Sequence, residues 1–293
     1  MKQIKNSLLI LIATLLPGIL FAASPILVPA WQTEAHFEQA ESVVYDATNQ
    51  LLYVSNINGD GMEADYDGYI SSLSLDGQIV DLHWLEGLHA PKGLTIVGNF
   101  LYVADINELV VIDIRSKKVT QRYSAPNAKF LNDVAADDKG NIYVSAFLTN
   151  TLYRLKEGIF DVWIESEELE VPNGLLVEGN QLILASWGHM TDGFATDITG
   201  HLKTINLDTK EIKSLGDKTP IGNLDGIEPD GEGNYFVTDW MTGELLHITP
   251  SGISSILVSL ERGSADHTVL LDQNLVIIPM MLTGNIVAFE IKK

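Results

Sequence analysis

One short apolar segment recurs six times along the chain at nearly regular spacing. The six copies occupy residues 52–55, 101–104, 142–145, 182–185, 235–238 and 275–278. Their first residues are 49, 41, 40, 53 and 40 positions apart. Repeats of about 40 to 50 residues, each holding several short strands, are typical of β-propeller blades. The pattern therefore predicts an all-β chain folded as a six-bladed β-propeller.

Turn-forming residues separate the apolar segments from their neighbours. Gly98-Asn99 and Gly179-Asn180 each stand just before a copy and predict a hairpin from an earlier strand. Two more strands follow each copy, as at 69–75 and 79–84 around Asp76-Gly77. Each repeat thus predicts four strands, with helix almost nowhere in the chain.

The last repeat contains only three strands, the last over residues 284–291. We therefore expect residues 26–32 to supply its fourth strand, which would join the two ends of the ring and remove an exposed sheet edge. A β-sandwich is the alternative all-β fold, but it gives no reason for six copies of one segment.

The first residues resemble a secretory signal peptide. Lys2 and Lys5 precede an apolar run over residues 8–22, and small residues follow it. Residues 1–23 are the predicted signal and residues 24–293 the predicted propeller domain, which we expect in the periplasm or secreted. A retained anchor is the alternative, but the run is shorter than a membrane span and is interrupted at Pro17-Gly18. We expect no membrane association after cleavage.

Charge narrows the set of partners. The chain has 39 Asp and Glu against 18 Lys and Arg, which gives a net charge of −21 and disfavours nucleic acid and anionic lipid. It has no cysteine, so stability does not come from disulfides. A small-molecule partner fits this composition best, while the oligomeric state has no signal in the sequence.

Polar residues recur at one place in every repeat. In a propeller the innermost strand of each blade lines the central axis. Counting back 9 to 11 residues from each apolar segment, into the expected innermost strand, gives Glu41, Lys92, Asn132, Asn173, Asp225 and Asp266. Any one of these alone is best explained as a turn cap. Because all six occupy equivalent positions, we expect them to converge on the axis.

The side chains at these positions favour a hard cation. Carboxylate and carboxamide oxygens without a thiol suit Ca²⁺, or alternatively Mg²⁺ or Mn²⁺, rather than Zn²⁺. A bound divalent cation polarises a carbonyl oxygen and makes water beside a carboxylate easier to deprotonate.

The order of these motifs resembles a known family. Glu41 before an apolar strand, Leu131-Asn-Asp133, Val171-Pro-Asn-Gly174 and Leu224-Asp-Gly226 stand in separate blades. Together they resemble the senescence marker protein/gluconolactonase (regucalcin) family over residues 36–291, with a more distant resemblance to paraoxonases and diisopropyl fluorophosphatase.

The resemblance implies a Ca²⁺-dependent hydrolase of lactones or related esters. It implies Glu41, Asn132, Asn173 and Asp225 as metal ligands, and Asp225 also as general base or nucleophile. His267 matches a histidine that helps to hold a second Ca²⁺ in the phosphotriesterase branch, which makes it a further catalytic candidate. A hydrogen-bonded wall residue is the alternative for His267.

One departure from the family concerns the substrate. The sugar-lactone hydrolases have an Arg two residues before the Asn of the third blade, whereas this chain has Phe130. We therefore expect Phe130 to contact a more apolar lactone or ester. Lys92 and Asp266 are further substrate-binding candidates; Lys92 has the alternatives of pairing with Asp225 or Asp266 across the channel and of pointing into solvent.

Two long insertions, 56–68 and 187–198, are expected to overhang the channel and set specificity. Trp187 begins the second, either as a substrate contact or as the anchor of the loop. A metal-dependent lactonase or esterase is the leading hypothesis. The alternatives are a non-catalytic ligand-binding propeller in the periplasm with a structural Ca²⁺ and, within the hydrolases, a phosphotriesterase suggested by His267 alone.

Overall fold

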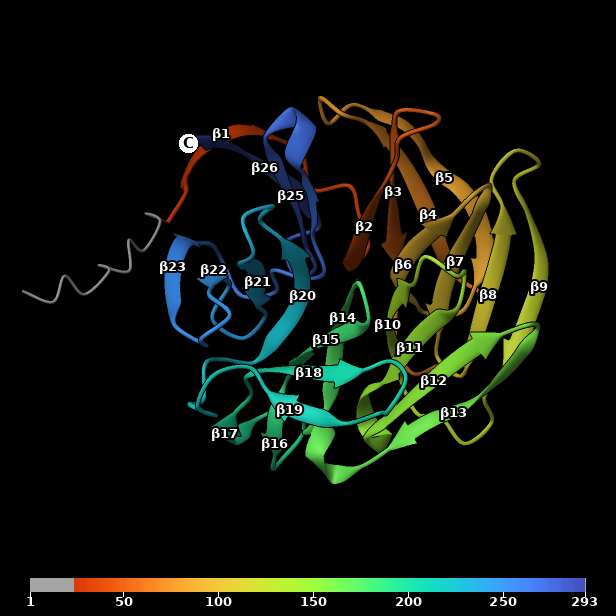
Figure 1. The fold of residues 1–293 in the computed structure, drawn as a ribbon. Coiled ribbons are helices and arrows are strands. Elements are labelled where there is room, and N and C mark those ends of the chain that lie inside the picture. Colours follow the sequence, from red (N-terminus) through yellow and green to blue (C-terminus); the bar gives the residue numbers. More distant parts are fainter. Residues whose placement is uncertain (1–23, 293) are drawn as a thin grey trace, which may run out of the picture.

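The computed structural model describes residues 24–292, which form six four-stranded antiparallel sheets arranged around a central axis (Figure 1). The predicted signal peptide, residues 1–23, lies outside the described residues. Residues 24–292 contain no helix with the length and apolar character of a membrane span. The six-bladed propeller that the repeat predicts is confirmed.

The first three blades follow the chain without interruption. The first contains β2 (Ala40–Asp46), β3 (Leu51–Asn56), β4 (Gly68–Ser74) and β5 (Ile79–Leu88). The second contains β6 (Pro91–Val97), β7 (Phe100–Asp105), β8 (Glu108–Asp113) and β9 (Lys118–Ser124). The third contains β10 (Leu131–Ala136), β11 (Ile142–Ala146), β12 (Thr151–Lys156) and β13 (Ile159–Glu165).

The fourth blade carries an insertion and the sixth closes the ring. The fourth contains β14 (Pro172–Glu178), β15 (Gln181–Ser186), β18 (Leu202–Asn206) and β19 (Ile212–Ser214). The fifth contains β20 (Leu224–Pro229), β21 (Tyr235–Asp239), β22 (Glu244–Ile248) and β23 (Ser254–Ser259). The sixth contains β24 (Thr268–Leu270), β25 (Leu275–Met280), β26 (Asn285–Lys292) and β1 (Ile26–Gln32).

The predicted ring closure is also confirmed. Strand β1 pairs antiparallel with β26, from Ile26 opposite Lys292 to Gln32 opposite Val287. The two ends of the described chain therefore share one blade, which leaves no open seam in the ring.

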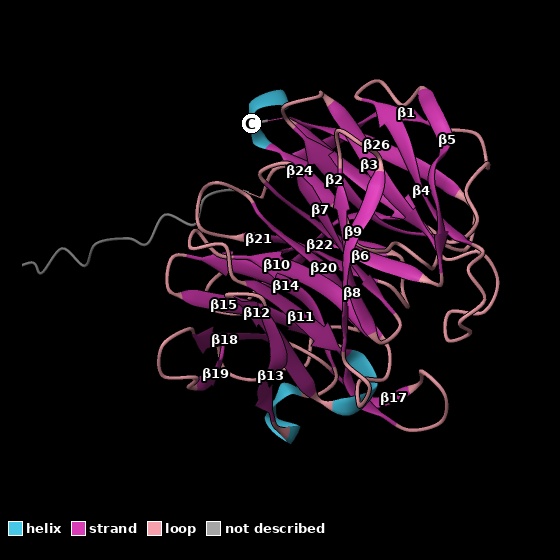
Figure 2. Cartoon of the chain, turned by 90° about the vertical axis from the view of Figure 1, so that its right-hand side faces the viewer, coloured by secondary structure: helices cyan, strands magenta, loops and turns pink. Residues whose placement is uncertain are grey.

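Little besides the blades is regular (Figure 2). Between β15 and β18, β16 (Gly188–Met190) and β17 (Thr196–Thr199) pair as a separate hairpin, so the insertion expected as a loop is partly a sheet. Single turns of 3-10 helix occur at η1 (Phe147–Thr149), η2 (Glu167–Leu169) and η3 (Leu271–Gln273).

The apolar core lies between neighbouring blades. Six clusters of buried side chains occupy the six junctions; the first, for example, joins Tyr53 and Ile70 to Leu101 and Val110. The second strand of each blade is covered on both faces, and β11 and β21 are buried throughout. This explains why these strands read as continuous apolar segments rather than alternating ones.

Candidate active site

The predicted axial residues lie at β-bulges on the innermost strands. The strand pairing skips two residues in five of the six blades, between Ala40 and Val43, Pro91 and Leu94, Leu131 and Val134, Pro172 and Leu175, and Leu224 and Ile227. The first residue inside each gap is the one expected at the axis. A bulge re-aims a side chain that a regular strand would bury between blades. The five side chains at equivalent positions of the repeat are therefore all directed toward the axis.

At three of these bulges, a side-chain hydroxyl accepts a hydrogen bond from a backbone N–H that the strand pairing leaves free. The N–H groups of residues 42, 133 and 226 donate to the side-chain oxygens of Ser55, Ser145 and Thr238, at 2.9 to 3.0 Å. Each hydroxyl ends one of the recurring apolar segments. An unpaired buried N–H would be costly, so these bonds stabilise the bulged conformation that positions the residue before it.

Glycine follows the axial residue where neighbouring blades approach most closely. A β-carbon on Gly93 would lie 2.5 Å from the Asp133 Cα, and one on Gly226 would lie 2.7 Å from the Asp266 Cα. Both distances are far below van der Waals contact. The glycines of the Lys92-Gly93 and Asp225-Gly226 pairs therefore reflect packing around the axis rather than turn formation.

The axis opens into a cavity of about 290 Å³. It is lined by all four predicted metal ligands, Glu41, Asn132, Asn173 and Asp225, and by three of the four predicted substrate contacts, Lys92, Phe130 and Trp187. All four candidate ligands are buried. The volume suits a small molecule rather than a polymer.

Two carboxylates in this cavity are unusually hard to ionise. Burial raises the pKa of Asp225 to about 8, with a further contribution from the nearby carboxylate of Asp133, although a hydrogen bond from Asn173 opposes the shift. Burial and then Asp225 raise the pKa of Glu41 well above its usual range, while the ammonium of Lys92 partly offsets them. Glu41 and Asp225 thus form a negative site that lacks sufficient positive charge.

Two carboxamides complete the candidate ligand set. Asn173 Nδ2 donates to the backbone oxygen of Leu224 at 3.1 Å, which fixes its Oδ1 on the side of Asn132. Asn132 Nδ2 donates to that Oδ1. Rotating the Asn132 carboxamide by half a turn would exchange its nitrogen and oxygen, so both residues have an oxygen to offer.

These residues fit a hard divalent cation. Glu41 Oε2 is buried and has no hydrogen-bond partner, and all candidate donor atoms are oxygens. Within residues 24–292 no three His, Cys, Asp or Glu side chains are grouped to hold a metal ion, so binding would depend on the two carboxamides. A cation here would favour the ionised form of both carboxylates and so offset the burial, and then the repulsion, that raises their pKa values.

A profile of the family described as SMP-30/Gluconolactonase/LRE-like region matches residues 39–262, which is most of the chain. The chain belongs to this family. No curated protein matches it at a significant level.

Two solved structures resemble this family member in fold. A gluconolactonase from Xanthomonas campestris aligns with a TM-score of 0.67 and 12% identity, over 94% of this chain and 99% of that one. A chain from a nidogen/laminin complex aligns with a TM-score of 0.55 and 17% identity, over 72% of this chain and 76% of that one. At these identities the comparison concerns the fold alone.

In this SMP-30/gluconolactonase-like propeller, Lys92 holds the first insertion in place. Lys92 is fully buried, and its ammonium donates to the backbone oxygens of Gly61 at 3.0 Å and Ala90 at 2.9 Å. Its nitrogen lies 4.3 Å from the centre of the Phe130 ring. Among the described residues it forms no ion pair with Asp225 or Asp266, and it does not reach solvent.

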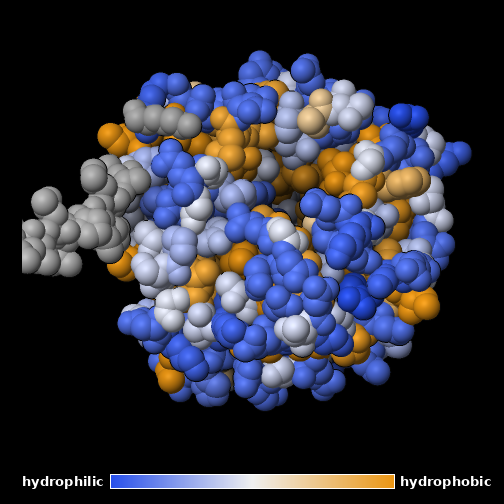
Figure 3. Space-filling model, in the orientation of Figure 1, coloured by the Kyte–Doolittle hydropathy of each residue, from blue (hydrophilic) through white to orange (hydrophobic). Residues whose placement is uncertain are grey.

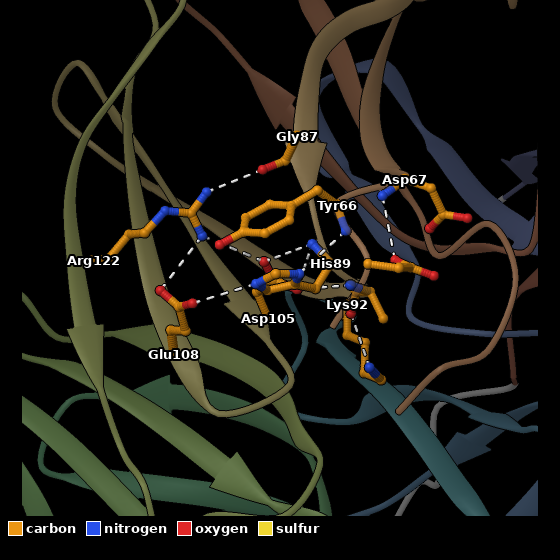
Figure 4. Close-up of polar contacts among 10 residues, drawn as sticks. Tyr66, Asp67, Gly87, His89, Lys92, Asp105, Glu108 and Arg122 are labelled. Carbon is orange, nitrogen blue, oxygen red and sulfur yellow. Dashed lines mark hydrogen bonds and ion pairs between the residues drawn. The ribbon is translucent and has the colours of Figure 1, made fainter. Parts of the chain in front are cut away.

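A charged network supports Lys92 and the same insertion from the second blade (Figure 4). Asp105 accepts the backbone N–H groups of His89 and Ala90, at 3.0 and 2.7 Å, and Arg122 lies 3.4 Å from Glu108. The backbone N–H of Tyr66, in the insertion, donates to His89 Nδ1 at 3.3 Å, and the two rings pack at a tilt of 48° with centroids 4.0 Å apart. Residues 57–67 are therefore clamped over the cavity at both Gly61 and Tyr66.

Asp266 and His267 line a different cavity from the four candidate ligands. A second cavity of about 170 Å³ is bordered by Asp133, Glu228, Asp266 and His267. Asp266 accepts a hydrogen bond from the Ser42 hydroxyl at 2.5 Å, which ties the sixth blade to the first. Burial lowers the pKa of His267 to about 3, and neither ring nitrogen has a hydrogen-bond partner.

The face shown in Figure 3 is hollowed at its centre, between polar and apolar side chains.

Sequence reasoning missed most of the cavity wall. Besides Phe130 and Trp187, the wall includes Ile57, Met62, Phe147, Phe194, Trp240, Met281 and Leu282. A signal existed, because the fifth residue after the start of a recurring segment is Ile57, Phe147, Trp187 or Trp240 in four of the blades. In these four blades, the axial residue before the apolar segment lies at the floor of the cavity and the residue after it lies in the wall.

Trp187 both anchors its insertion and lines the cavity. Its side chain is buried, and its Nε1 donates to the Phe194 backbone oxygen at 3.0 Å. Asn223 Nδ2 donates to the Trp187 backbone oxygen at 2.9 Å. The two alternatives for this residue are thus compatible, because the fixed indole also presents its surface to the cavity.

Proposed function

We propose that this protein is a divalent-metal-dependent hydrolase of lactones or related esters. One observation carries the proposal: four bulged strands bring two carboxylates and two carboxamides to the floor of one small cavity. Membership of the SMP-30/gluconolactonase family and the gluconolactonase-like fold support it.

Glu41, Asn132, Asn173 and Asp225 are the residues that would hold the cation. Their oxygens suit Ca²⁺, with Mg²⁺ or Mn²⁺ as alternatives. When bound, the cation supplies Lewis acidity toward the substrate carbonyl and raises the acidity of a nearby water. It would also restore the ionised form of Asp225, whose pKa burial raises to about 8.

Asp225 is the proposed general base. Its carboxylate accepts a proton from water as the water oxygen bonds to the carbonyl carbon of the lactone. The ring C–O bond then breaks, and the leaving alkoxide takes the proton from Asp225. The product is a hydroxy acid, and the carboxylate is regenerated. Direct attack by Asp225 as a nucleophile is the alternative route.

The surrounding residues prepare this step without entering it. Asn173 donates to Leu224 and so keeps its oxygen directed at the floor of the cavity. Residues 57–67, held by Lys92, cover the site and limit water. His267 borders the second cavity rather than the substrate cavity. Any effect of His267 on catalysis would therefore act through the residues at the axis and not by contact with this substrate.

Initial rates on aliphatic lactones, sugar lactones and aryl esters test the proposal, with chelator and then with Ca²⁺ restored. Chelator-sensitive turnover that Ca²⁺ restores, and that is lost in Asp225→Asn, is the expected result. If no substrate is turned over but chelator lowers the melting temperature, the alternative of a ligand-binding propeller with a structural Ca²⁺ replaces it. Finding the protein in the periplasm or medium, cleaved near residue 23, would test the proposed export.

A further inference from the structure

Five aromatic rings form a continuous surface along one side of the site cavity. Ring centroids are 5.7 Å apart for Phe130 and Phe147, 5.4 Å for Phe147 and Trp187, and 6.1 Å for Trp187 and Trp240. Phe194 lies 5.9 Å from Phe147 and 6.2 Å from Phe130. These separations are those of packed aromatic pairs, so the surface is a single apolar wall.

The wall is built by several independent elements. Trp187 and Trp240 follow the second strands of the fourth and fifth blades, while Phe194 comes from the β16–β17 hairpin. Phe130 has a left-handed backbone, with φ of 64°, which costs a bulky residue about 1 to 2 kcal/mol. That strained conformation places its ring beside Lys92 and in the cavity wall.

The cavity offers few polar groups beyond its floor. Apart from the four candidate ligands, its polar side chains are those of Gln39, Asp60 and Lys92, against nine apolar ones. Gln39 Nε2 already donates to the Gly59 oxygen, and Lys92 donates to two backbone oxygens. A substrate rich in hydroxyl groups would lose its hydrogen bonds to water and find few partners here.

The rim of the cavity continues the apolar character outward. Met62, Phe194 and Leu282 line the cavity and are also 54%, 44% and 56% exposed. An apolar chain that leaves the floor would therefore pass along apolar side chains as far as solvent.

We propose that the aromatic wall is a subsite for a neutral apolar substituent, which makes the substrate an alkyl- or aryl-bearing lactone or ester rather than a sugar lactone. This rests on the proposed function for the reacting group, which lies at the floor while the substituent lies against Trp187, Trp240 and Phe194. Aromatic walls also bind organic cations. Here the ammonium of Lys92 already occupies the Phe130 face, at 4.3 Å, and opposes a second cation.

A chain-length series tests the subsite in the Ca²⁺-loaded enzyme. We expect kcat/KM to rise about fourfold for each methylene added to the substituent of a γ-lactone, because each is removed from water. Glucono-δ-lactone should be the poorer substrate by more than tenfold. In Phe194→Ala and Trp240→Ala the gain per methylene should shrink, whereas Ile198→Ala should keep it. Ile198 is 58% exposed on the same hairpin and does not line the cavity.

Charge is tested with two esters of one shape. The 3,3-dimethylbutyl ester and the choline ester of the same acid differ in a single positive charge, and we expect the neutral one to react faster. A flat response to chain length, a preference for the sugar lactone or a preference for the choline ester would each overturn the proposal.

A binding measurement separates this proposal from the proposed function. Hexan-1-ol and glucitol have the same number of carbons, and only the first should change the protein's tryptophan fluorescence. The change should be reduced in Trp240→Phe and Trp187→Phe. If no lactone or ester is hydrolysed but hexan-1-ol binds in this way, the hydrolase fails and the apolar subsite stands. If turnover occurs but hexan-1-ol does not bind or compete, the subsite fails alone.

Discussion

A β-carbon placed on Gly174 would lie 1.9 Å from the backbone oxygen of Asp225 in the next blade. Asn173 directly precedes Gly174 in the sequence. Both Asn173 and Asp225 are candidate metal ligands. The fourth and fifth blades thus approach most closely at the site itself. Glycine is required there because no other residue leaves room for the neighbouring backbone.

We therefore expect Gly174→Ala to lower the free energy of unfolding by about 3 kcal/mol, since the clash is with backbone that cannot rotate away. Urea denaturation measures this. Gly179→Ala is the matched control: it lies in the same blade, at φ of 56°, with no atom within 4 Å of the added carbon. Its cost should be about 1 kcal/mol, from backbone strain alone. Equal losses in the two variants would show that the blades separate easily.

Metal binding should stabilise the folded protein and should require the floor of the cavity. At a Ca²⁺ concentration 100 times its Kd, linkage predicts a gain of about 2.7 kcal/mol, seen as a rise in Tm. Glu41→Gln and Asp225→Asn should abolish that rise, because each removes a charged oxygen donor. They should also raise the Tm of the metal-free protein, since each removes a buried carboxylate that is hard to ionise. A full Ca²⁺ response in both variants would place the cation elsewhere.

The fold was predictable from the sequence because a propeller repeats one unit. The spacing of the apolar segments showed six blades, and the missing fourth strand of the last repeat indicated the β1–β26 pair, from Ile26 to Lys292. The axial residues were predictable for the same reason. Five blades have a bulge at the same place in the innermost strand, so the axial residue stands at nearly the same distance before each apolar segment. Repetition turned a weak local pattern into a strong one.

The rest depended on features that do not repeat. Phe194 reaches the cavity from a hairpin of two very short strands, which have no periodic pattern to detect. The sixth blade lacks the bulge that the pairing of the other five shows, and packing decides which cavity its inner residues face, so Asp266 and His267 could not be assigned to the second cavity. The burial of Lys92 follows from the path of residues 57–67, an insertion with its own conformation.

Lys92 should control the cover of the cavity. In Lys92→Met the bond to the Gly61 oxygen is lost while most of the buried volume is kept, so residues 57–67 should exchange amide hydrogens faster. KM should rise by more than kcat falls if the insertion mainly covers the substrate. Hydrogen exchange followed by mass spectrometry locates the change. Lys117→Met is the control, because Lys117 is exposed and its ammonium pairs with Asp81 rather than with the insertion. Unchanged exchange over residues 57–67 would contradict the clamp.

Stability should fall with rising pH through Glu228 in the second cavity. Burial, and then the carboxylate of Asp133, raise the pKa of Glu228 to about 8. A raised carboxyl pKa means that the folded protein holds this proton more tightly than the unfolded chain. The contribution is therefore present below the unfolded pKa, near 4.3, and is lost as pH rises through about 8. Glu228→Gln should lose less stability over that range in urea unfolding. Glu232→Gln, in an exposed turn, should behave like the parent.

Strand β1, which closes the ring, should stabilise the protein even when it is supplied as a separate peptide. A chain that begins at Thr33 lacks β1, so β26 would become an open edge and Trp31 would no longer pack against the first blade near Gly77. We expect a lower Tm and association of chains through the exposed edge, measured by calorimetry and size-exclusion chromatography. A synthetic peptide of residues 24–32 should restore both by adding as a strand, whereas a peptide of the same composition in scrambled order should not. Unchanged stability without β1 would mean that three strands suffice for the sixth blade and that the ring is held by its axis, where Ser42 bonds to Asp266.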